Sequence, residues 1–268
     1  MIGPPGSGKT TYTHGMAEFL RAVGRDVAIV NLDPAGSTSP YTAAANISEL
    51  VTVDDAMASC GLGPNGAMIF CMEVLEKNVD SWLLPRLREL VHERPKLYLL
   101  FDLPGQVELF THHPSLQNVL RRVQRNLGAS LVAVHLVDAL HCAEPGRLVS
   151  VILLSLSAML RLELPHINVL SKIDLVRDDD VDGGALRTQL DLRGDEGGLD
   201  LSCLLPIPGV VDSGRSSRFQ RLNAAVSEIV EEFGLVSFQA LSVLSKERMV
   251  NLVRVLDKAI GFVAAQDG

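Results

Sequence analysis

The sequence is poor in cysteine. Its 268 residues include four cysteines, at positions 60, 71, 142 and 203, and no two of them form a C-x-x-C pair. Zinc sites and disulfide frameworks need closely spaced or numerous cysteines. The cysteine pattern therefore speaks against both and favours a reducing compartment.

Positive charge is also scarce. The chain has 24 Lys and Arg against 32 Asp and Glu, a net charge of -8, and no basic run is interleaved with aromatic residues. Neutralising the phosphates of a nucleic acid requires a surplus of Lys and Arg. We therefore expect no direct binding to nucleic acid.

Long apolar runs are absent as well. The longest, Leu148 to Leu160, contains three serines and is followed by Arg161, whereas a membrane-spanning helix needs about 20 apolar residues. We expect a buried helix there, no membrane contact and no signal peptide before the first motif. A hydrophobic content of 47% predicts a well-filled core. Together with the scattered cysteines, the lack of a signal peptide and of a membrane span leads us to expect a cytoplasmic protein.

The fold class follows from alternating patterns. Nearly continuous apolar runs are typical of strands buried on both faces of a parallel sheet, and helical patterns lie between these runs. This alternation predicts an α/β fold with a doubly wound, mostly parallel sheet flanked by helices, and a single domain over residues 1–268. The predicted strands are 27–33, 97–102, 131–138, 167–174 and 236–241, and the predicted helices are 10–23, 115–127, 147–160, 218–233 and one from 245. Two acidic, Gly-rich segments, from Arg177 and from Arg193, read as solvated loops.

A phosphate-binding motif stands at the start of the chain, where GPPGSGKT at 3–10 fits G-x-x-x-x-G-K-[ST]. Its glycines let backbone N–H groups approach phosphate oxygens at the positive end of the following helix. We predict that Lys9 reaches the β- and γ-phosphates, that the Thr10 hydroxyl binds Mg²⁺, and that Thr11 meets the α-phosphate. The predicted phosphate-binding residues are Gly3, Pro4, Pro5, Gly6, Ser7, Gly8, Lys9, Thr10 and Thr11.

A strand ordinarily precedes such a loop, but only Met1 and Ile2 do so here. We therefore expect a truncated first strand and a damaged centre of the sheet.

A second motif, Asp102-Leu103-Pro104-Gly105-Gln106, ends the run 97–102. It resembles the D-x-x-G element of GTPases, although these four residues alone would also fit a plain turn. We predict that Asp102 holds Mg²⁺ through water, that the Gly105 N–H senses the γ-phosphate, and that Gln106 orients the attacking water.

A third motif, Ser171-Lys172-Ile173-Asp174, resembles the [N/T]-K-x-D element that binds guanine. The Asp174 carboxylate can accept two N–H bonds from guanine, which adenine does not offer, and the Lys172 stem can lie over the base. Ser171 replaces the usual Asn or Thr. The three motifs follow one another in the order of a GTPase.

Two further segments are ambiguous. Asp33 ends the run 27–33 before Pro34, which favours an extended backbone, so that Asp33 is either a helix cap or a group that binds Mg²⁺-linked water or acts as a base. Residues 62–67, LGPNGA, read as a tight turn in which Pro64 fixes φ and Asn65 tolerates positive φ.

Taken together, GPPGSGKTT, NLDPA, GPN, DLPGQVE and SKID resemble the GPN-loop GTPases over nearly the whole chain. The resemblance implies a P-loop fold and a dimer in which the GPN loop of each subunit enters the active site of its partner. Asn65 would then contact phosphate or the nucleophilic water across the interface. The family pattern also implies that Asp33, Asp102, Gln106 and Glu108 organise water and Mg²⁺, with GTP as substrate and GDP as product.

The resemblance further implies a role in assembly and nuclear import of RNA polymerase II, with shuttling to the nucleus. The implied partners are a second copy or other GPN-loop GTPases, and polymerase subunits or assembly factors. One departure from the family is Asn46, which stands where an aspartate is expected. Two alternatives stay open beside a GTP-hydrolysing switch: an ATP-dependent P-loop kinase or ligase, and a GTP-binding module without turnover.

Overall fold

The computed structural model describes residues 1–35, 39–142, 145–176 and 237–262. The predicted loops after Arg177 and Arg193, the predicted helix at 218–233 and Cys203 lie outside the described residues.

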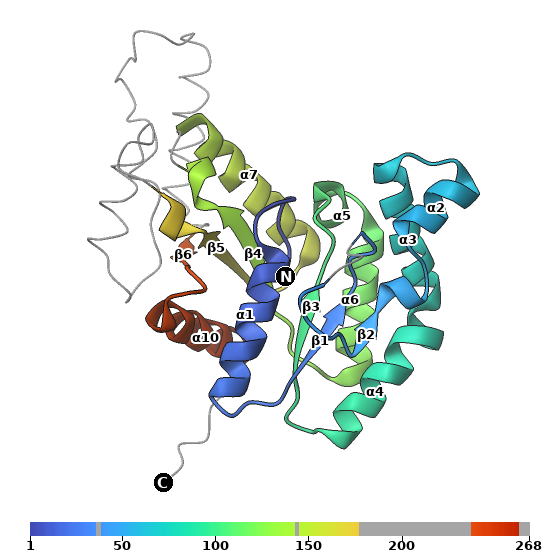
Figure 1. Ribbon diagram of the computed structural model, residues 1–268, viewed down its shortest axis with the longest axis horizontal. Coiled ribbons are helices and arrows are strands. Elements are labelled where there is room, and N and C mark those ends of the chain that lie inside the picture. Colours follow the sequence, from blue (N-terminus) through green and yellow to red (C-terminus); the bar gives the residue numbers. More distant parts are fainter. Residues whose placement is uncertain (36–38, 143–144, 177–236, 263–268) are drawn as a thin grey trace.

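The described strands are all parallel and form two three-stranded sheets, with the orders β2-β1-β3 and β4-β5-β6 (Figure 1). All five predicted strands are present within a few residues of their predicted bounds, and only the two-residue β2 was not foreseen. The strands are β1 Val27–Asn31, β2 Ala45–Asn46, β3 Tyr98–Asp102, β4 Ala133–Asp138, β5 His166–Ser171 and β6 Phe238–Ala240.

Helices cover both faces of the sheets, as the alternating pattern predicts (Figure 1). The α-helices are α1 Lys9–Ala22, α2 Val53–Cys60, α3 Pro64–Asn78, α4 Leu84–Glu93, α5 Val107–Thr111, α6 Pro114–Leu127, α7 Pro145–Leu162 and α10 Lys246–Ile260. Short helices are η1 Ile47–Glu49, the π-turn η2 Val79–Leu83, η3 Ala139–Cys142 and η4 Ile173–Leu175. Within the described part of the chain, no helix has the length and apolarity that crossing a membrane requires.

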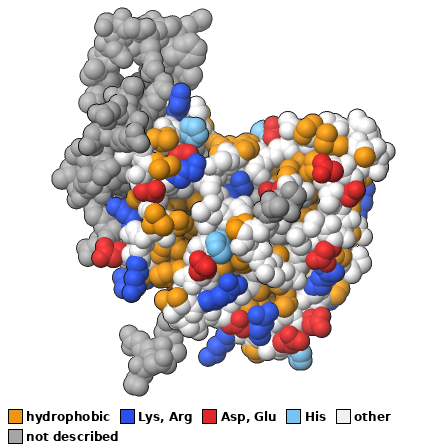
Figure 2. Space-filling model, viewed as in Figure 1, with side chains coloured by type: hydrophobic (Ala, Val, Ile, Leu, Met, Phe, Trp, Pro, Cys, Tyr) orange, Lys and Arg blue, Asp and Glu red, His pale blue; other side chains and the backbone are white. Residues whose placement is uncertain are grey.

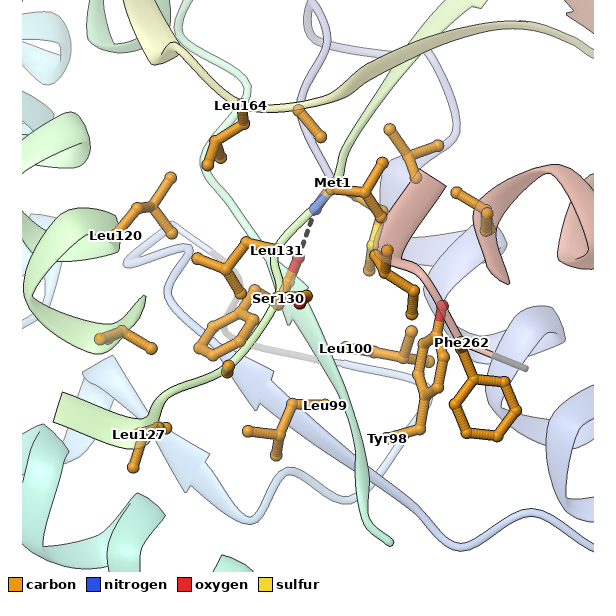
Figure 3. Close-up of a pocket in the computed structure, with 18 of the residues that line it drawn as sticks. Met1, Tyr98, Leu99, Leu100, Leu120, Leu127, Ser130, Leu131, Leu164 and Phe262 are labelled. Carbon is orange, nitrogen blue, oxygen red and sulfur yellow. Dashed lines mark hydrogen bonds between the residues drawn. The ribbon is translucent and has the colours of Figure 1, made fainter. Parts of the chain in front are cut away.

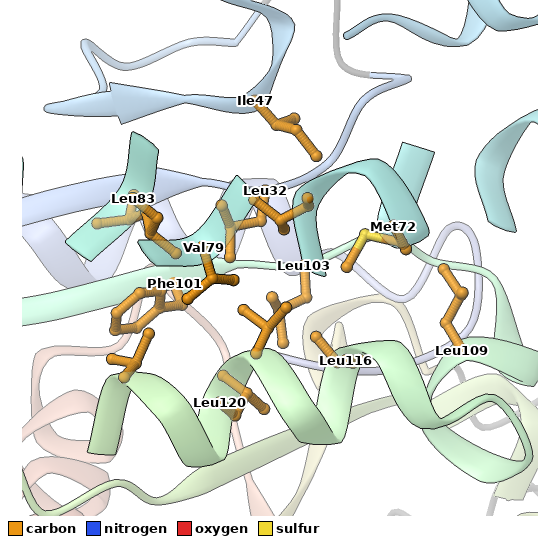
Figure 4. Packing of buried hydrophobic residues seen from close by; sticks show 14 of the residues in the cluster. Leu32, Ile47, Met72, Val79, Leu83, Phe101, Leu103, Leu109, Leu116 and Leu120 are labelled. Atoms are coloured by element: carbon orange, nitrogen blue, oxygen red, sulfur yellow. The ribbon is translucent and has the colours of Figure 1, made fainter. Parts of the chain in front are cut away.

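The core lies in layers on either side of the strands because neighbouring strand residues point to opposite faces. In β3, Leu100 packs with α1 and α10, while Phe101 packs with α3, α4 and α6. Figure 4 shows the second layer, in which Phe101 and Leu120 lie with Val79 and Leu83. The sheet is therefore buried on both faces, which explains the unbroken apolar runs in the sequence.

The interpretation of residues 62–67 as a tight turn is wrong. Gly63 has an extended backbone and caps α3, and Pro64 and Asn65 form the first turn of that helix. Proline suits this position because its fixed φ is helical and its missing N–H has no partner to lose there. A Gly-Pro pair resembles a turn signal, which hid the start of the helix.

The two sheets meet at a position that holds only Met1 and Ile2. Ile2 bonds to β4 through Ile2 N to Val134 O and Leu136 N to Ile2 O, both 2.9 Å, while the Met1 amine donates to Phe101 O of β3. Below these residues the space between β3 and β4 is an apolar cavity of about 460 Å³ (Figure 3). The expected interruption at the centre of the sheet is therefore present.

Backbone groups face this cavity from both sides. The backbone groups of even-numbered β3 residues bond to β1, so those of Leu99 and Phe101 point toward the cavity. In β4, odd-numbered residues bond to β5, so the backbone groups of Val132 and Val134 face the cavity from the other side. The amine of Met1 is itself fully buried, and this burial lowers its pKa to about 6. Of these backbone groups, Phe101 O and Val134 O are bonded to Met1 N and Ile2 N. The others face the cavity, and together with the buried amine they destabilise this region.

Four apolar, β-branched residues added before Met1 should stabilise the protein, because they would pair with β3 and β4 and replace the buried amine by an amide. The gain from burying the side chains exceeds the loss of chain entropy by about 2 kcal/mol, which corresponds to roughly 5 °C in the unfolding midpoint. Thermal unfolding with and without GDP and Mg²⁺ measures this change. A four-residue Gly-Ser addition is the control, and equal midpoints for the two additions would contradict the expectation.

A buried histidine, His135, and a partly buried one, His166, lie beside the same junction. His135 Nδ1 is 3.2 Å from Asn168 Oδ1 and 3.1 Å from Ser155 Oγ, and the His166 ring lies edge-on to His135. Among the described residues neither ring nitrogen of His166 has a well-formed hydrogen bond, although the nearby Asn168 side chain opposes part of the lowering of its pKa. Burial lowers the pKa of His135 to about 3 and that of His166 to about 4.

These two histidines should make the fold sensitive to mild acid. Because their folded pKa values lie below the ordinary 6.5, their contribution is complete above pH 6.5 and declines as the pH falls below it. The expected loss between pH 8 and pH 5 is about 2 kcal/mol per histidine, before most carboxylates titrate. Urea unfolding at the two pH values measures it. His166→Phe should remove about half of the loss, and an unchanged pH dependence in that variant would contradict this account.

Candidate functional site

The predicted motifs converge at the carboxyl ends of the strands, where ligands bind in sheets of this kind (Figure 1). The phosphate-binding loop follows Ile2, Asp102 ends β3, Asp138 ends β4, and Ser171 ends β5. Figure 2 shows a notch in the outline of the molecule on this side, between the part that carries α7 and the part that carries α2 and α3.

The phosphate-binding loop is shaped by its glycines. Gly3 has φ +142°, and a Cβ there would lie 2.3 Å from Leu136 O, so that no other residue fits between the loop and β4. Gly8 has φ +88° and caps α1, whose first residue is Lys9. The backbone N–H groups at this helix start remain available for an anion.

Lys9 lies folded against its own loop. Its Nζ donates to Gly3 O at 3.0 Å and to Pro4 O at 3.1 Å, and its side chain is almost completely buried. Burial lowers the pKa of Lys9, while the carboxylates of Asp33 and Asp102 oppose this effect. The charges of Lys9, Asp33 and Asp102 therefore act on one another beside the loop.

The second motif touches the first. A Cβ at Gly105 would lie 2.8 Å from Lys9 Nζ and 3.2 Å from Pro5 Cα, so a larger residue would require both the lysine side chain and the Pro5 backbone to shift. Asp102 is 1% exposed; its Oδ2 accepts a hydrogen bond from the Tyr41 hydroxyl at 2.6 Å. In the described structure its Oδ1 is buried without a partner.

The remaining predicted water- and magnesium-organising residues differ in burial. The Asp33 carboxylate is largely buried, which raises its pKa, and Asp33 Oδ1 accepts a hydrogen bond from Ala35 N at 3.0 Å. Gln106 caps α5, and its Oε1 is buried with no partner among the described residues. Glu108 is exposed in the first turn of α5. Asp33 and Gln106 are thus less exposed to solvent than Glu108.

The third motif is braced against the first. Ser171 Oγ lies 2.8 Å from Ser7 O and 3.0 Å from Val137 O, so this serine joins β5 to the phosphate-binding loop and to β4. Lys172 has φ +60°, and its Nζ lies 2.7 Å from Asp138 Oδ2. Asp174 is exposed in η4. The serine that replaces Asn or Thr keeps the contact between the loops.

Asn65 lies in the first turn of α3, whereas the other predicted motifs follow the ends of strands. It is exposed at the start of α3, and Figure 1 shows α3 well apart from α1 and the phosphate-binding loop. Within the described residues no hydrogen bond joins Asn65 to that loop. The chain does not itself bring Asn65 into the site.

The site has groups that suit a magnesium nucleotide. Among the described residues there is no cluster of three or more His, Cys, Asp or Glu that would hold a metal without further ligands. Mg²⁺ is commonly held by one or two protein groups, water and substrate phosphates. The Thr10 hydroxyl in the first turn of α1 and the Asp102 carboxylate at the end of β3 fit this arrangement.

Two contacts at the site were not predicted from the sequence. Tyr41 donates to Asp102 from a segment that carries no motif, and Asp138 pairs with Lys172. Asp138 ends a predicted apolar strand, which is a signal that could have identified it. Asn46, which stands where the family has an aspartate, makes two contacts of its own. Its Oδ1 accepts hydrogen bonds from Ser48 N at 3.1 Å and from Asn31 Nδ2 at 3.3 Å.

Known proteins resemble the chain over almost its full length. A family model described as a conserved hypothetical ATP binding protein matches residues 1–262. GPN-loop GTPase 2 of Danio rerio is 48% identical over 262 residues, covering 98% of this chain and 80% of that protein. GPN-loop GTPase 2 of Saccharomyces cerevisiae is 41% identical over 264 residues, covering 98% and 74%.

A solved structure supports the same assignment. The apo form of a GTPase from Pyrococcus abyssi has a TM-score of 0.73 and 27% sequence identity to this chain, and the match covers 97% of both chains. The fold is therefore that of a P-loop NTPase. With relatives above 40% identity over nearly all of its residues, the chain belongs to the family of GPN-loop GTPases.

Proposed function

We propose that the protein binds and hydrolyses GTP and acts as a dimeric switch. The observation that carries this proposal is that both other motifs meet the phosphate-binding loop: a Cβ at Gly105 would meet Lys9 Nζ, and Ser171 Oγ donates to Ser7 O. The relatives described above are named GTPases, which supports GTP as the substrate. Affinity for GDP against ADP tests the base, since the matching family model names ATP.

The proposed roles follow from position. Backbone N–H groups of the loop 3–8 and the start of α1 bind the phosphates, with Lys9 released from Gly3 O and Pro4 O to meet them. Mg²⁺, when bound, would neutralise phosphate charge and would be held by Thr10 and, through water, by Asp102. The Gln106 amide, whose Oε1 is unpartnered among the described residues, orients the attacking water, with Asp33 and Glu108 as further members of the set.

The dimer is proposed because one chain leaves the site incomplete. Asn65 is exposed and remote from the phosphate-binding loop of its own chain, and Gly63 and Pro64 beside it are exposed as well. In an isologous dimer each subunit can give its loop to the other. We propose that Asn65 acts on the nucleotide of the partner, whether the partner is a second copy or another GPN-loop GTPase.

The wider role rests on the family resemblance of the sequence alone. We propose that the protein takes part in assembly and nuclear import of RNA polymerase II, in the cytoplasm with shuttling to the nucleus. The partners would be polymerase subunits or assembly factors.

Base selection should depend on Asp174. A carboxylate that accepts two N–H bonds from guanine leaves those groups unpaired against adenine, which corresponds to a preference of about 10⁴-fold for GDP over ADP. Competition binding measures the preference, and Asp174→Asn should shift it toward xanthine nucleotides. Equal affinities for GDP and ADP would instead support a kinase or ligase that uses ATP.

The role of Asn65 is tested by mixing two inactive variants. Asn65→Ala should lower turnover by roughly 10²–10³ with little change in GTP affinity, as the loss of a positioned donor does in other enzymes. Lys9→Ala removes the phosphate contact. In a mixed dimer, the intact Lys9 of one chain and the intact Asn65 of the other form one working site, so phosphate release should recover.

The control is each variant alone at the same total concentration, with the mixed species verified by two different affinity tags. A verified mixed dimer that releases no phosphate would show that Asn65 does not act across the interface. Tight GTP binding without turnover in the unaltered protein would favour a binding module.

A further inference from the structure

A hydrogen bond from a residue outside the predicted motifs occupies one oxygen of the Asp102 carboxylate. Its Oδ2 accepts the Tyr41 hydroxyl at 2.6 Å, and its Oδ1 is buried and has no partner in the described structure. Asp102 as a whole is 1% exposed. Oδ2 is thus occupied by Tyr41 and Oδ1 is enclosed by the protein, so that neither oxygen is open to a metal-bound water in this conformation.

Tyr41 belongs to a segment that is fixed at both ends. At one end, Asp33 N donates to Asn31 Oδ1 at 3.1 Å; at the other, Ala44 N donates to Ile29 O at 2.8 Å and β2 pairs with β1. Tyr41 is only partly buried and packs at the edge of the layer that contains α1. The Tyr41 contact is thus made by the described residues 39–43, next to Ala44 and β2, which are held on β1.

We propose that Tyr41 is a positioning residue, which holds the Asp102 carboxylate in the ligand-free protein and gives it up when magnesium and nucleotide bind. This proposal rests on the proposed function, because it requires that the site binds a nucleotide together with magnesium. A buried carboxylate oxygen without a donor is unfavourable, so Tyr41 stabilises Asp102 until metal-bound water supplies the hydrogen bond. Magnesium binding is in this way linked to the position of residues 39–44.

Tyr41→Phe tests the exchange because it removes the hydroxyl and keeps the ring. Magnesium no longer displaces a hydrogen bond to a charged group, so the Mg²⁺ affinity at saturating GDP should rise roughly tenfold. GDP affinity in EDTA should stay within about twofold, since the substitution leaves the phosphate-binding loop unchanged. Isothermal titration of Mg²⁺ and of GDP measures both quantities.

The matched control is Tyr98→Phe, which removes the same hydroxyl at the opposite end of β3, about 13 Å along the strand from Asp102. It should leave the Mg²⁺ affinity unchanged. Hydrogen exchange of the ligand-free protein adds a readout that needs no nucleotide: in Tyr41→Phe the amides of residues 39–44 should exchange at least about threefold faster.

The outcomes separate this proposal from the proposed function. If Mg²⁺ fails to strengthen GDP binding in the unaltered protein, both are overturned. If Mg²⁺ strengthens it normally but Tyr41→Phe binds Mg²⁺ with equal or lower affinity, the exchange at Tyr41 is overturned alone. Unchanged hydrogen exchange at 39–44 would show that Tyr41 does not hold the segment.

Discussion

The backbone pairing of Ile2 with β4 is the constraint on which the site depends. Two hydrogen bonds of 2.9 Å fix Ile2, and Gly3 then passes so close to Leu136 O that a side chain would not fit. The position of the loop relative to the sheet is set at this point. The preceding residue, Met1, bonds to Phe101 O of β3, so the site and the contact between the two sheets share one junction.

From that junction the electrostatics of the site follow. Lys9 is nearly buried and lies under the influence of Asp33 and Asp102, while its amino group is satisfied by Gly3 O and Pro4 O. Burying a cation near two carboxylates is tolerable because each charge has a partner. The ligand-free site therefore satisfies most of its groups internally, and the unpartnered oxygens of Asp102 and Gln106 mark where hydrogen bonds remain to be made.

The sequence was sufficient for most of the fold because parallel strands buried on both faces leave unbroken apolar runs, as in β4 and β5. The phosphate-binding loop and the Asp102 and Ser171 motifs were also readable, since each follows such a run. The start of α3 was not, because a helix that opens on Pro64 and a turn share the same residues. The Tyr41 contact and the unpartnered His166 were beyond prediction, since each depends on residues brought together only by the fold.

The central claim is that three loops held together at the strand ends form a site that hydrolyses GTP. Phosphate release by the purified protein, measured with GTP and with ATP at equal concentrations and with Lys9→Ala as the background, tests it most directly. The account predicts release from GTP well above that background and little from ATP. Release from ATP at an equal or higher rate, or no release from GTP above the background, would contradict it.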